Sequence, residues 1–262
     1  MPVALTIAGS DSGGGAGIQA DLKMFAALGV HGTSVVTAVT AQNPRRVLDM
    51  QAVRPALVRR QLEAVFAELP PAAVKTGMLC SGATVRIVAD FFRHRSRPVL
   101  IVDPVLISTS GTALLAPAAL RVLREKLLPL AALVTPNLAE AAVLSGRTVR
   151  SPEDLRAAAR EIHRRHGCAV LVKGGHLRGA TEAADLFYNG TTELLLAAPF
   201  VRGVRTHGTG CTYSAAIAGW CARGEALARA VALAKADITR AIAQSVRVAG
   251  HDVLCFGLRR TR

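Results

Sequence analysis

The sequence predicts an α/β protein in which helices cover both faces of a mostly parallel sheet. Short apolar and β-branched runs alternate with amphipathic segments along the chain, which is the pattern of strands separated by helices. Hydrophobic residues make up 51% of the 262 positions, so the chain can bury a large core. No linker, low-complexity block or repeat interrupts the pattern. We therefore expect residues 1–262 to form a single domain.

Six runs rich in aliphatic and β-branched residues predict strands: Val3–Ala8, Ser34–Val39, Val74–Leu79, Val99–Val102, Ala132–Thr135 and Ala169–Lys173. Amphipathic segments predict helices near residues 16–28, 54–69, 82–95, 117–127, 138–145 and 152–166. The first predicted helix follows the first strand directly, which leaves no room there for a separate lid domain.

Capping signals support several of these helix boundaries. Ser151 supplies an N-cap, Pro152 suits the first helical position, and Gly167 follows the last turn of the same helix. Gly29 and Gly146 can close two other helices in the same way.

Residues 184–201 predict a β-hairpin, since Asn189-Gly190 suits a tight turn between two apolar runs. A glycine loop at Gly208 and two closing helices are expected after it.

The composition excludes several classes of protein. The longest apolar runs are short, so we expect no membrane span, and the N-terminus lacks the pattern of a signal peptide. Five cysteines without a paired spacing favour a reducing compartment, so a cytoplasmic protein is expected and structural zinc is not.

The formal net charge of +14 raises the possibility of nucleic-acid binding. The arginines, however, are scattered along helical segments such as 54–60, 93–97 and 156–165, and aromatic residues are few. We interpret these arginines as solvated helix faces, expect no nucleic-acid partner, and consider the charge compatible with an anionic substrate such as a nucleotide.

Residues 207–214, His-Gly-Thr-Gly-Cys-Thr-Tyr-Ser, carry the strongest chemical signal. A glycine turn leads directly into a helix of small residues, so converging N–H groups and the helix dipole favour an anion there. Cys211 lies in the first helical turn, where the dipole favours thiolate and so a base or nucleophile. The alternative is an ordinary turn with Cys211 as a small apolar residue.

Polar residues follow the first three predicted strands. The glycine loop over residues 9–17 fits neither a dinucleotide fingerprint nor a Walker loop, and is expected to form a close wall against a small ligand. Asp21 is placed to hydrogen-bond that ligand or to satisfy the helix dipole. Gln42 offers a donor and an acceptor to a heterocycle, or is a surface amide. Met78 can pack against a flat ring or fill the core.

The next three strand ends contribute Asp103, Asn137 with Glu140, and Lys173. Two acids and an amide predict a magnesium environment, reached mostly through waters, and Lys173 is suited to neutralise nucleotide phosphates. The Thr135-Pro136-Asn137 segment, taken alone, is also a normal helix cap.

With these residues considered together, nearly all of residues 3–248 resembles the ribokinase superfamily, and more closely the hydroxymethylpyrimidine/phosphomethylpyrimidine kinases of thiamine biosynthesis. Seven ordered motifs carry the resemblance, at residues 8–21, 37–43, 75–78, 103–105, 135–141, 173–176 and 208–212.

The resemblance implies ATP-dependent phosphorylation of 4-amino-5-hydroxymethyl-2-methylpyrimidine and then of its monophosphate, with Mg2+ and a homodimer. It implies that Gln42 binds the pyrimidine, with Gly9, Asp21, Met78 and Val105 around the same pocket.

The same resemblance implies that the turn Gly208-Thr209-Gly210-Cys211 is an anion hole, with Cys211 standing where many sugar kinases of the superfamily carry an aspartate base. Asp103 and Glu140 match positions associated with magnesium, and Asp103, Asn137 and Lys173 match positions associated with nucleotide phosphates.

Two departures from the family pattern are visible. Ser108-Thr109-Ser110-Gly111 replaces a lysine that some relatives carry, so phosphate contacts there are expected to come from hydroxyls and backbone. Residues 250–262 lack the Gly-His-Gly-Pro ending expected of the family. The alternatives are a pyridoxal or pyridoxine kinase, and a non-catalytic pyrimidine-binding protein.

Overall fold

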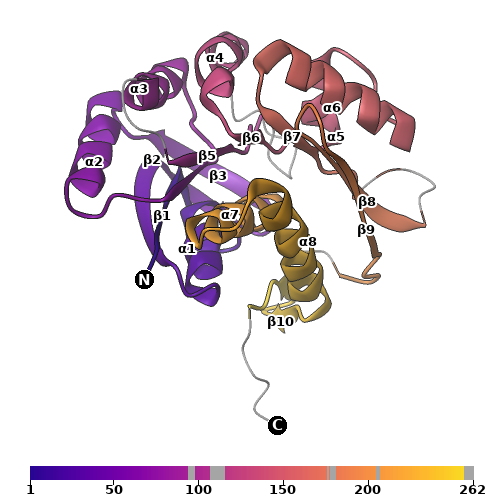
Figure 1. Ribbon diagram of the computed structural model, residues 1–262. Helices are drawn as coiled ribbons and strands as arrows, with labels where there is room; N and C mark the ends of the chain where they lie inside the picture. The colour runs from indigo at the N-terminus through magenta and orange to yellow at the C-terminus, as the bar shows by residue number, and fades with distance from the viewer. Residues whose placement is uncertain (94–97, 107–115, 176, 178–180, 205–206, 257–262) are drawn as a thin grey trace.

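Nine strands form one sheet in the computed structural model, which describes residues 1–93, 98–106, 116–175, 177, 181–204 and 207–256 (Figure 1). Their order is β3-β2-β1-β4-β5-β6-β7-β8-β9. The strands are β1 (Val3–Asp11), β2 (His31–Asn43), β3 (Arg46–Ala52), β4 (Ala73–Thr76), β5 (Val99–Val102), β6 (Leu133–Val134), β7 (Ala169–Val172), β8 (Glu182–Tyr188) and β9 (Glu193–Pro199). Pairing is parallel from β2 to β7 and antiparallel at both ends, which confirms the mostly parallel sheet.

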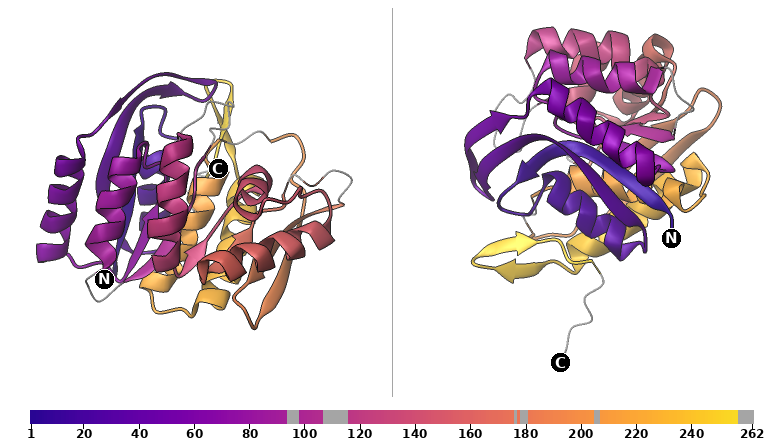
Figure 2. Two further views of the ribbon diagram at one scale, coloured as in Figure 1. Left: turned by 90° about the horizontal axis from the view of Figure 1, so that it is seen from above. Right: turned by 90° about the vertical axis from the view of Figure 1, so that its left-hand side faces the viewer.

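Helices cover both faces of the sheet, as expected (Figure 2). One layer contains α2 (Pro55–Glu68), α3 (Gly82–Arg93), α4 (Pro117–Val122), α5 (Leu138–Ser145) and α6 (Pro152–His166). The other contains α1 (Gly17–Ala27), α7 (Thr209–Ala222) and α8 (Leu227–Ala243). Each layer buries its own hydrophobic core against the sheet, so the strands are apolar on both sides.

The elements with strong patterns lie where they were expected. Both ends of α5 and of α6 agree with the prediction, and the hairpin predicted at 184–201 is β8–β9. The fourth predicted helix is shorter, because α4 continues as a π-helical turn over Leu123–Leu127 and a 3-10 turn over Leu128–Leu130. The third predicted strand ends at Thr76 instead of Leu79, since the chain leaves the sheet at Gly77.

Two hairpins were not predicted. Strand β3 lies at an exposed edge of the sheet and therefore lacks the alternating apolar pattern. The short pair β10 (Val246–Val248) and β11 (His251–Val253) follows α8 and forms a separate two-stranded sheet.

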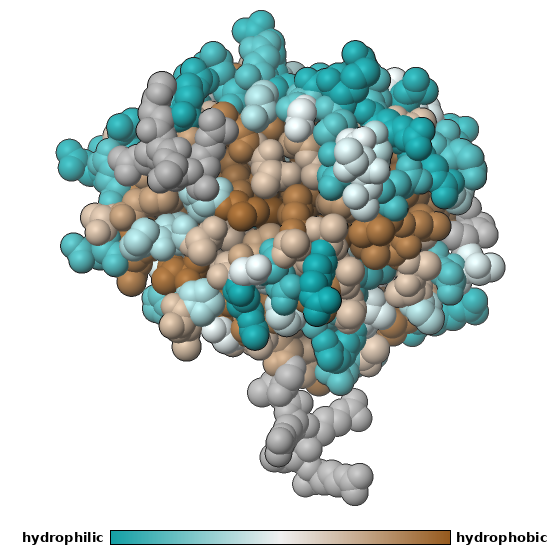
Figure 3. Space-filling view, in the orientation of Figure 1, coloured by the Kyte–Doolittle hydropathy of each residue, from teal (hydrophilic) through white to brown (hydrophobic). Residues whose placement is uncertain are grey.

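Hydrophobic residues extend across the middle of the face in Figure 3, and hydrophilic residues surround its upper rim. The arginines of α6 lie at the protein surface, where they form ion pairs with Glu153, Glu161 and Glu193. Among the described residues, no helix has both the length and the apolar character needed to cross a bilayer.

Candidate active site

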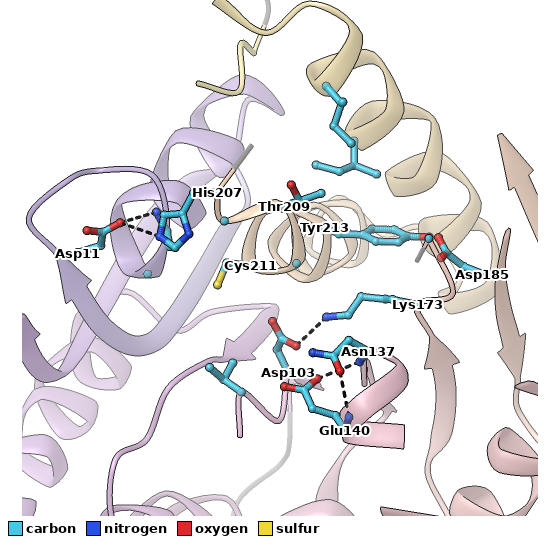
Figure 4. Close-up of a pocket in the computed structure, with 18 of the residues that line it drawn as sticks. Asp11, Asp103, Asn137, Glu140, Lys173, Asp185, His207, Thr209, Cys211 and Tyr213 are labelled. Carbon is cyan, nitrogen blue, oxygen red and sulfur yellow. Dashed lines mark hydrogen bonds and ion pairs between the residues drawn. The ribbon is translucent and has the colours of Figure 1, made fainter. Parts of the chain in front are cut away.

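A cavity of about 890 Å³ opens at the carboxyl ends of the parallel strands, where ligands bind in open α/β sheets. Its walls come from the ends of β1, β2, β4, β5, β6 and β7, from the start of α7, and from parts of β8, β9 and α8 (Figure 4). All but one of the residues predicted for the site line this cavity: Gly9, Gln42, Met78, Asp103, Val105, Asn137, Glu140, Lys173, Gly208, Thr209, Gly210 and Cys211. The exception is Asp21.

The Gly208 loop forms one wall and can have only glycine at its centre. Gly208 has φ 78°, and a Cβ built on it would lie 1.8 Å from the carbonyl oxygen of Gly15. The loop before α1 and the loop before α7 are therefore in direct backbone contact. Helix α7 begins at Thr209, so its first N–H groups, including those of Gly210 and Cys211, have no carbonyl partner within the helix. This arrangement suits an anion.

Cys211 lies at that helix start, but its thiol does not behave as the dipole argument predicts. Burial raises the pKa of Cys211, and the ammonium of Lys75 only partly offsets this effect. Burial removes the sulfur from water and so disfavours the charged form, which opposes the thiolate that the helix start favours.

Asp21 lies behind the cavity wall and is fully buried. Its Oδ2 accepts hydrogen bonds from Lys75 Nζ at 2.8 Å and from Thr6 Oγ1 at 2.6 Å. Direct contact between Asp21 and a ligand, as the sequence analysis expected, is not available in this structure. Asp21 instead holds the ammonium of Lys75, which does line the cavity.

Lys75 belongs to the motif at residues 75–78 but was not predicted as a site residue. Burial alone would lower its pKa, but the carboxylate of Asp21, with smaller effects from Cys211 and Asp103, raises the pKa well above its usual value. This direction favours the charged ammonium, which interacts electrostatically with Cys211 in the anion-binding turn. The sequence signal that could have identified Lys75 is a lysine within an apolar strand, since lysine is almost never fully buried unless it is paired.

Gln42 and the loop before α7 meet at the other end of the cavity. Gln42 Nε2 lies 2.9 Å from His207 Nε2, and Thr40 Oγ1 lies 3.3 Å from Gln42 Oε1. His207 Nε2 also lies 3.5 Å from Asp11 Oδ2. Neither His207 nor Asp11 was predicted as a site residue, because a histidine before a glycine turn has no spacing signal of its own.

Apolar contacts complete this end. A Cβ on Gly9 would lie 2.4 Å from Met78 Cε, so glycine at position 9 makes room for the methionine side chain. Val105 adopts φ 36°, a conformation that a β-branched residue rarely takes, directly after Asp103-Pro104. Met78 and Val105 both line the cavity, as expected of a pocket for a flat ring.

Lys173 and Asp103 form an ion pair of 2.9 Å in the middle of the cavity. Asp103 Oδ2 also accepts a hydrogen bond from Ser214 Oγ at 3.2 Å. Burial would lower the pKa of Lys173, but Asp103 and Glu140 raise it. A Cβ on Gly210 would lie 3.2 Å from Lys173 Nζ, so this ammonium lies directly beside the anion-binding turn.

Asn137 and Glu140 form the capping box of α5. Asn137 Oδ1 accepts from the Glu140 N–H, and Glu140 Oε2 accepts from the Asn137 N–H, both at 2.9 Å. Glu140 Oε1 accepts from the Leu106 N–H at 3.1 Å. Burial raises the pKa of Glu140, and Lys173 offsets only part of this rise. Asn137 therefore caps α5 and also lines the cavity.

These residues fit magnesium only through its waters. Among the described residues, no group of three or more His, Cys, Asp or Glu is placed to hold a metal ion directly. Asp103 Oδ1 accepts from both Lys173 and Thr135, whereas Asp103 Oδ2 and the two Glu140 oxygens each accept one protein hydrogen bond and have a second lone pair. Magnesium retains several waters in most sites, so carboxylates of this kind suit a hydrated ion.

A second buried pair at the far end of the cavity was not predicted. Lys235 Nζ lies 2.7 Å from Asp185 Oδ2 and donates to the Ala183 carbonyl at 2.8 Å. The Tyr213 ring points from α7 toward Asp185 (Figure 4). The Ser108-Thr109-Ser110-Gly111 segment, where hydroxyl contacts to phosphate were expected, lies outside the described residues.

The family model for phosphomethylpyrimidine kinase matches residues 11–254. A hydroxymethylpyrimidine/phosphomethylpyrimidine kinase from Rhizobium meliloti is 51% identical over 247 residues, which cover 94% of this chain and 92% of that protein. A thiamine biosynthesis bifunctional protein from Geobacter sulfurreducens is 48% identical over 238 residues, which cover 91% of this chain and 48% of that longer protein.

Two solved structures show the same similarity in three dimensions. A phosphomethylpyrimidine kinase from Clostridium difficile has a TM-score of 0.82 and 40% identity, and the match covers 92% of this chain and all (100%) of that one. A Bacillus subtilis pyridoxal kinase, solved as an ADP complex, has a TM-score of 0.89 and 34% identity over 98% of this chain and 97% of that one. The similarity thus includes nearly every strand end that lines the cavity.

Proposed function

We propose a function from the premise that this chain belongs to the phosphomethylpyrimidine kinase family. It is an ATP-dependent kinase of ribokinase-like fold that phosphorylates 4-amino-5-hydroxymethyl-2-methylpyrimidine, and then the resulting monophosphate, in thiamine biosynthesis. The observation that carries this assignment is the family match over residues 11–254, within which the matched motifs converge on one cavity. Pyridoxal kinases are structural relatives of the chain.

The cavity divides into two ends with different chemistry. Gln42, Met78 and Val105 surround the end suited to the pyrimidine, since an amide and two apolar side chains match an aminopyrimidine ring. Asn137 and Lys173 lead toward the end suited to the nucleotide. The anion-binding turn at the start of α7 lies between the two ends, where the transferred phosphoryl group must pass.

Phosphoryl transfer requires an in-line arrangement and stabilisation of charge on the moving group. The N–H groups of the Gly208–Cys211 turn hold its oxygens, and the ammonium groups of Lys75 and Lys173 supply positive charge. These donors are in place before the substrate arrives, because the Gly15 contact and the two ion pairs fix them.

Cys211 is the side chain best placed to accept the proton of the substrate hydroxymethyl group. Its pKa is raised, so it acts through the minor fraction of molecules in which the thiol is ionised. The second phosphorylation has an acceptor phosphate that is already largely ionised at neutral pH and needs this proton transfer less.

Magnesium is proposed as the metal of the nucleotide end, held by Asp103 and Glu140 through water molecules. When bound, it would neutralise charge on the nucleotide phosphates. Asp103 is also held by Lys173 and Ser214, so its carboxylate is oriented without the metal.

A homodimer is proposed from the exposed apolar side chains on one edge of the sheet. Leu48 and Met50 lie on one face of the β2–β3 hairpin and are 59% and 39% exposed, and Val39, which pairs with Gln51, is 56% exposed on the other face. A partner of the same kind would cover them and the unpaired edge of β3. A cytoplasmic location is proposed on the five cysteines, all of which are free thiols.

One assay tests the function. ATP consumption is measured with the pyrimidine alcohol, its monophosphate and pyridoxine under the same conditions. We expect turnover with both pyrimidines and a much smaller kcat/KM with pyridoxine. Preference for pyridoxine would assign the chain to the pyridoxal kinase activity, and no ATP consumption with any of the three would remove the kinase proposal.

A further inference from the structure

The amide of Gln42 has two different ends, and the orientation of the amide decides what a ligand meets. The outer edge of a glutamine amide presents one carbonyl lone pair beside one N–H. An aminopyrimidine offers the complement, a ring nitrogen beside an amino group. A rotation of the Gln42 amide by 180° exchanges donor and acceptor, so the same residue then opposes the ring nitrogen with a carbonyl oxygen.

Thr40 does not determine this orientation. Its hydroxyl donates to the Ser10 carbonyl at 2.8 Å and lies 3.3 Å from Gln42 Oε1. The hydroxyl has a single proton, and its oxygen can also accept, so Thr40 tolerates either end of the amide.

His207 is the neighbour that can distinguish the two ends. Its Nε2 lies 2.9 Å from Gln42 Nε2, within normal hydrogen-bond range. An imidazole nitrogen that carries no proton accepts from the amide N–H and rejects the carbonyl oxygen. The contact from the same Nε2 to Asp11 Oδ2 is longer, at 3.5 Å, and the Asp11 carboxylate already accepts from the N–H groups of Gly13, Gly15 and Ala16.

The ring of His207 is itself held in place. Its side chain is only 21% exposed, and a Cβ on Gly15 would lie 3.2 Å from its Cδ2, so the ring packs against the backbone of the loop before α1. The next residue is Gly208, whose backbone is in contact with Gly15. The position of the imidazole relative to Gln42 is therefore fixed by backbone packing.

We propose that His207 is a specificity-determining positioning residue, which accepts a hydrogen bond from Gln42 Nε2 and so fixes the amide edge that faces the pyrimidine. The inference rests on the proposed function for the identity of the ligand. It adds a role for a side chain that contacts Gln42 and not the reacting atoms.

Three substitutions at this position separate its chemistry from its packing. His207→Phe keeps the ring and loses the acceptor. His207→Gln places an amide oxygen near the position of Nε2, whereas His207→Asn carries the same group on a side chain one bond too short to reach. His31→Phe is the matched control, because His31 is exposed at the opposite end of the strand that carries Gln42.

The variants are compared by steady-state kinetics, by calorimetric binding of the pyrimidine alcohol without nucleotide, and by thermal unfolding. We expect His207→Phe and His207→Asn to raise the KM and Kd for the pyrimidine about tenfold, with the KM for ATP changed less than about twofold. His207→Gln should restore most of the affinity, and His31→Phe should resemble the wild type.

Two results would overturn the inference. One is an unchanged pyrimidine KM and Kd in both His207→Phe and His207→Asn. The other is an equal loss in all three variants, or an equal rise in the KM for ATP, since either would indicate a structural role for the loop. A wild-type protein that does not phosphorylate the pyrimidine would contradict the proposed function instead, and the calorimetric comparison would still test His207.

Discussion

Two effects of opposite sign act on the thiol of Cys211. The start of α7 and the ammonium of Lys75 favour the thiolate, and burial favours the thiol. Burial has the larger effect, so the pKa of Cys211 is raised. The sequence indicated the helix start correctly, but the depth at which the side chain lies depends on the packing of the two glycine loops, which no local pattern encodes.

Replacement of Cys211 by alanine tests its role as the base. We expect turnover with the pyrimidine alcohol to fall roughly 10²-fold, and turnover with the monophosphate to fall much less. Cys221→Ala, in the same helix but outside the cavity lining, is the control and should retain wild-type turnover. Near-wild-type rates in Cys211→Ala would show that the backbone amides suffice and that the thiol is only a neighbour.

The pH dependence of the two reactions should differ for the same reason. Because burial raises the pKa of Cys211 above its usual value, the thiolate fraction increases throughout the range from neutral pH to about pH 9. Turnover with the alcohol should rise with pH over this range in the wild type and not in Cys211→Ala. The monophosphate reaction should stay nearly flat above about pH 6, where the acceptor phosphate is ionised. A flat profile for the alcohol would argue against Cys211 as the base.

Helices α5 and α6 begin with the same N-terminal capping motif. Each has a capping box, Asn137 with Glu140 in α5 and Ser151 with Asp154 in α6, and each ends at a glycine in the left-handed conformation. Both helices were predicted to the residue, since all of these signals are local. Asn137 differs from Ser151 in that it also lines the cavity.

Alanine substitutions at the two caps separate stability from ATP binding. Asn137→Ala and Ser151→Ala should each lower the free energy of unfolding by about 1 kcal/mol, which is a melting-temperature decrease of roughly 2–4 °C. Only Asn137→Ala should also raise the KM for ATP, by about tenfold, through the loss of a hydrogen bond to a charged ligand. If the KM for ATP changes equally little in both, Asn137 is a helix cap and nothing more.

Strand β3 and two buried ion pairs were not predicted, because each depends on contacts between residues far apart in the sequence. Strand β3 is exposed along most of its length, so its sequence Arg46–Ala52 shows no buried face, and its pairing depends on β2 extending beyond the parallel part of the sheet. The buried ion pairs of Lys75 with Asp21 and of Lys235 with Asp185 join residues 54 and 50 positions apart. Motifs located the strand ends correctly, but long-range partners of this kind follow only from the assembled sheet.

The two edges of the sheet differ in what they leave exposed. The β2–β3 edge exposes Leu48 and Met50 on one face and Val39 on the other, whereas Leu195 is the only exposed large hydrophobic side chain among the described residues of β8 and β9. An exposed strand edge with several apolar side chains is the kind of surface that another chain covers. We therefore expect the proposed homodimer to form through β2–β3.

Leu48→Glu tests this interface, because a two-fold axis would bring two glutamates into one buried surface. We expect the wild type to sediment at twice the chain mass of 27.4 kDa and Leu48→Glu to sediment as a monomer. Leu195→Glu, on the opposite edge and 49% exposed, is the matched control and should remain a dimer. Since the active-site cavity lies within one chain, the Leu48→Glu monomer should keep its KM for ATP. A monomeric wild type, or a Leu48→Glu protein that is still dimeric, would exclude the β2–β3 edge as the interface.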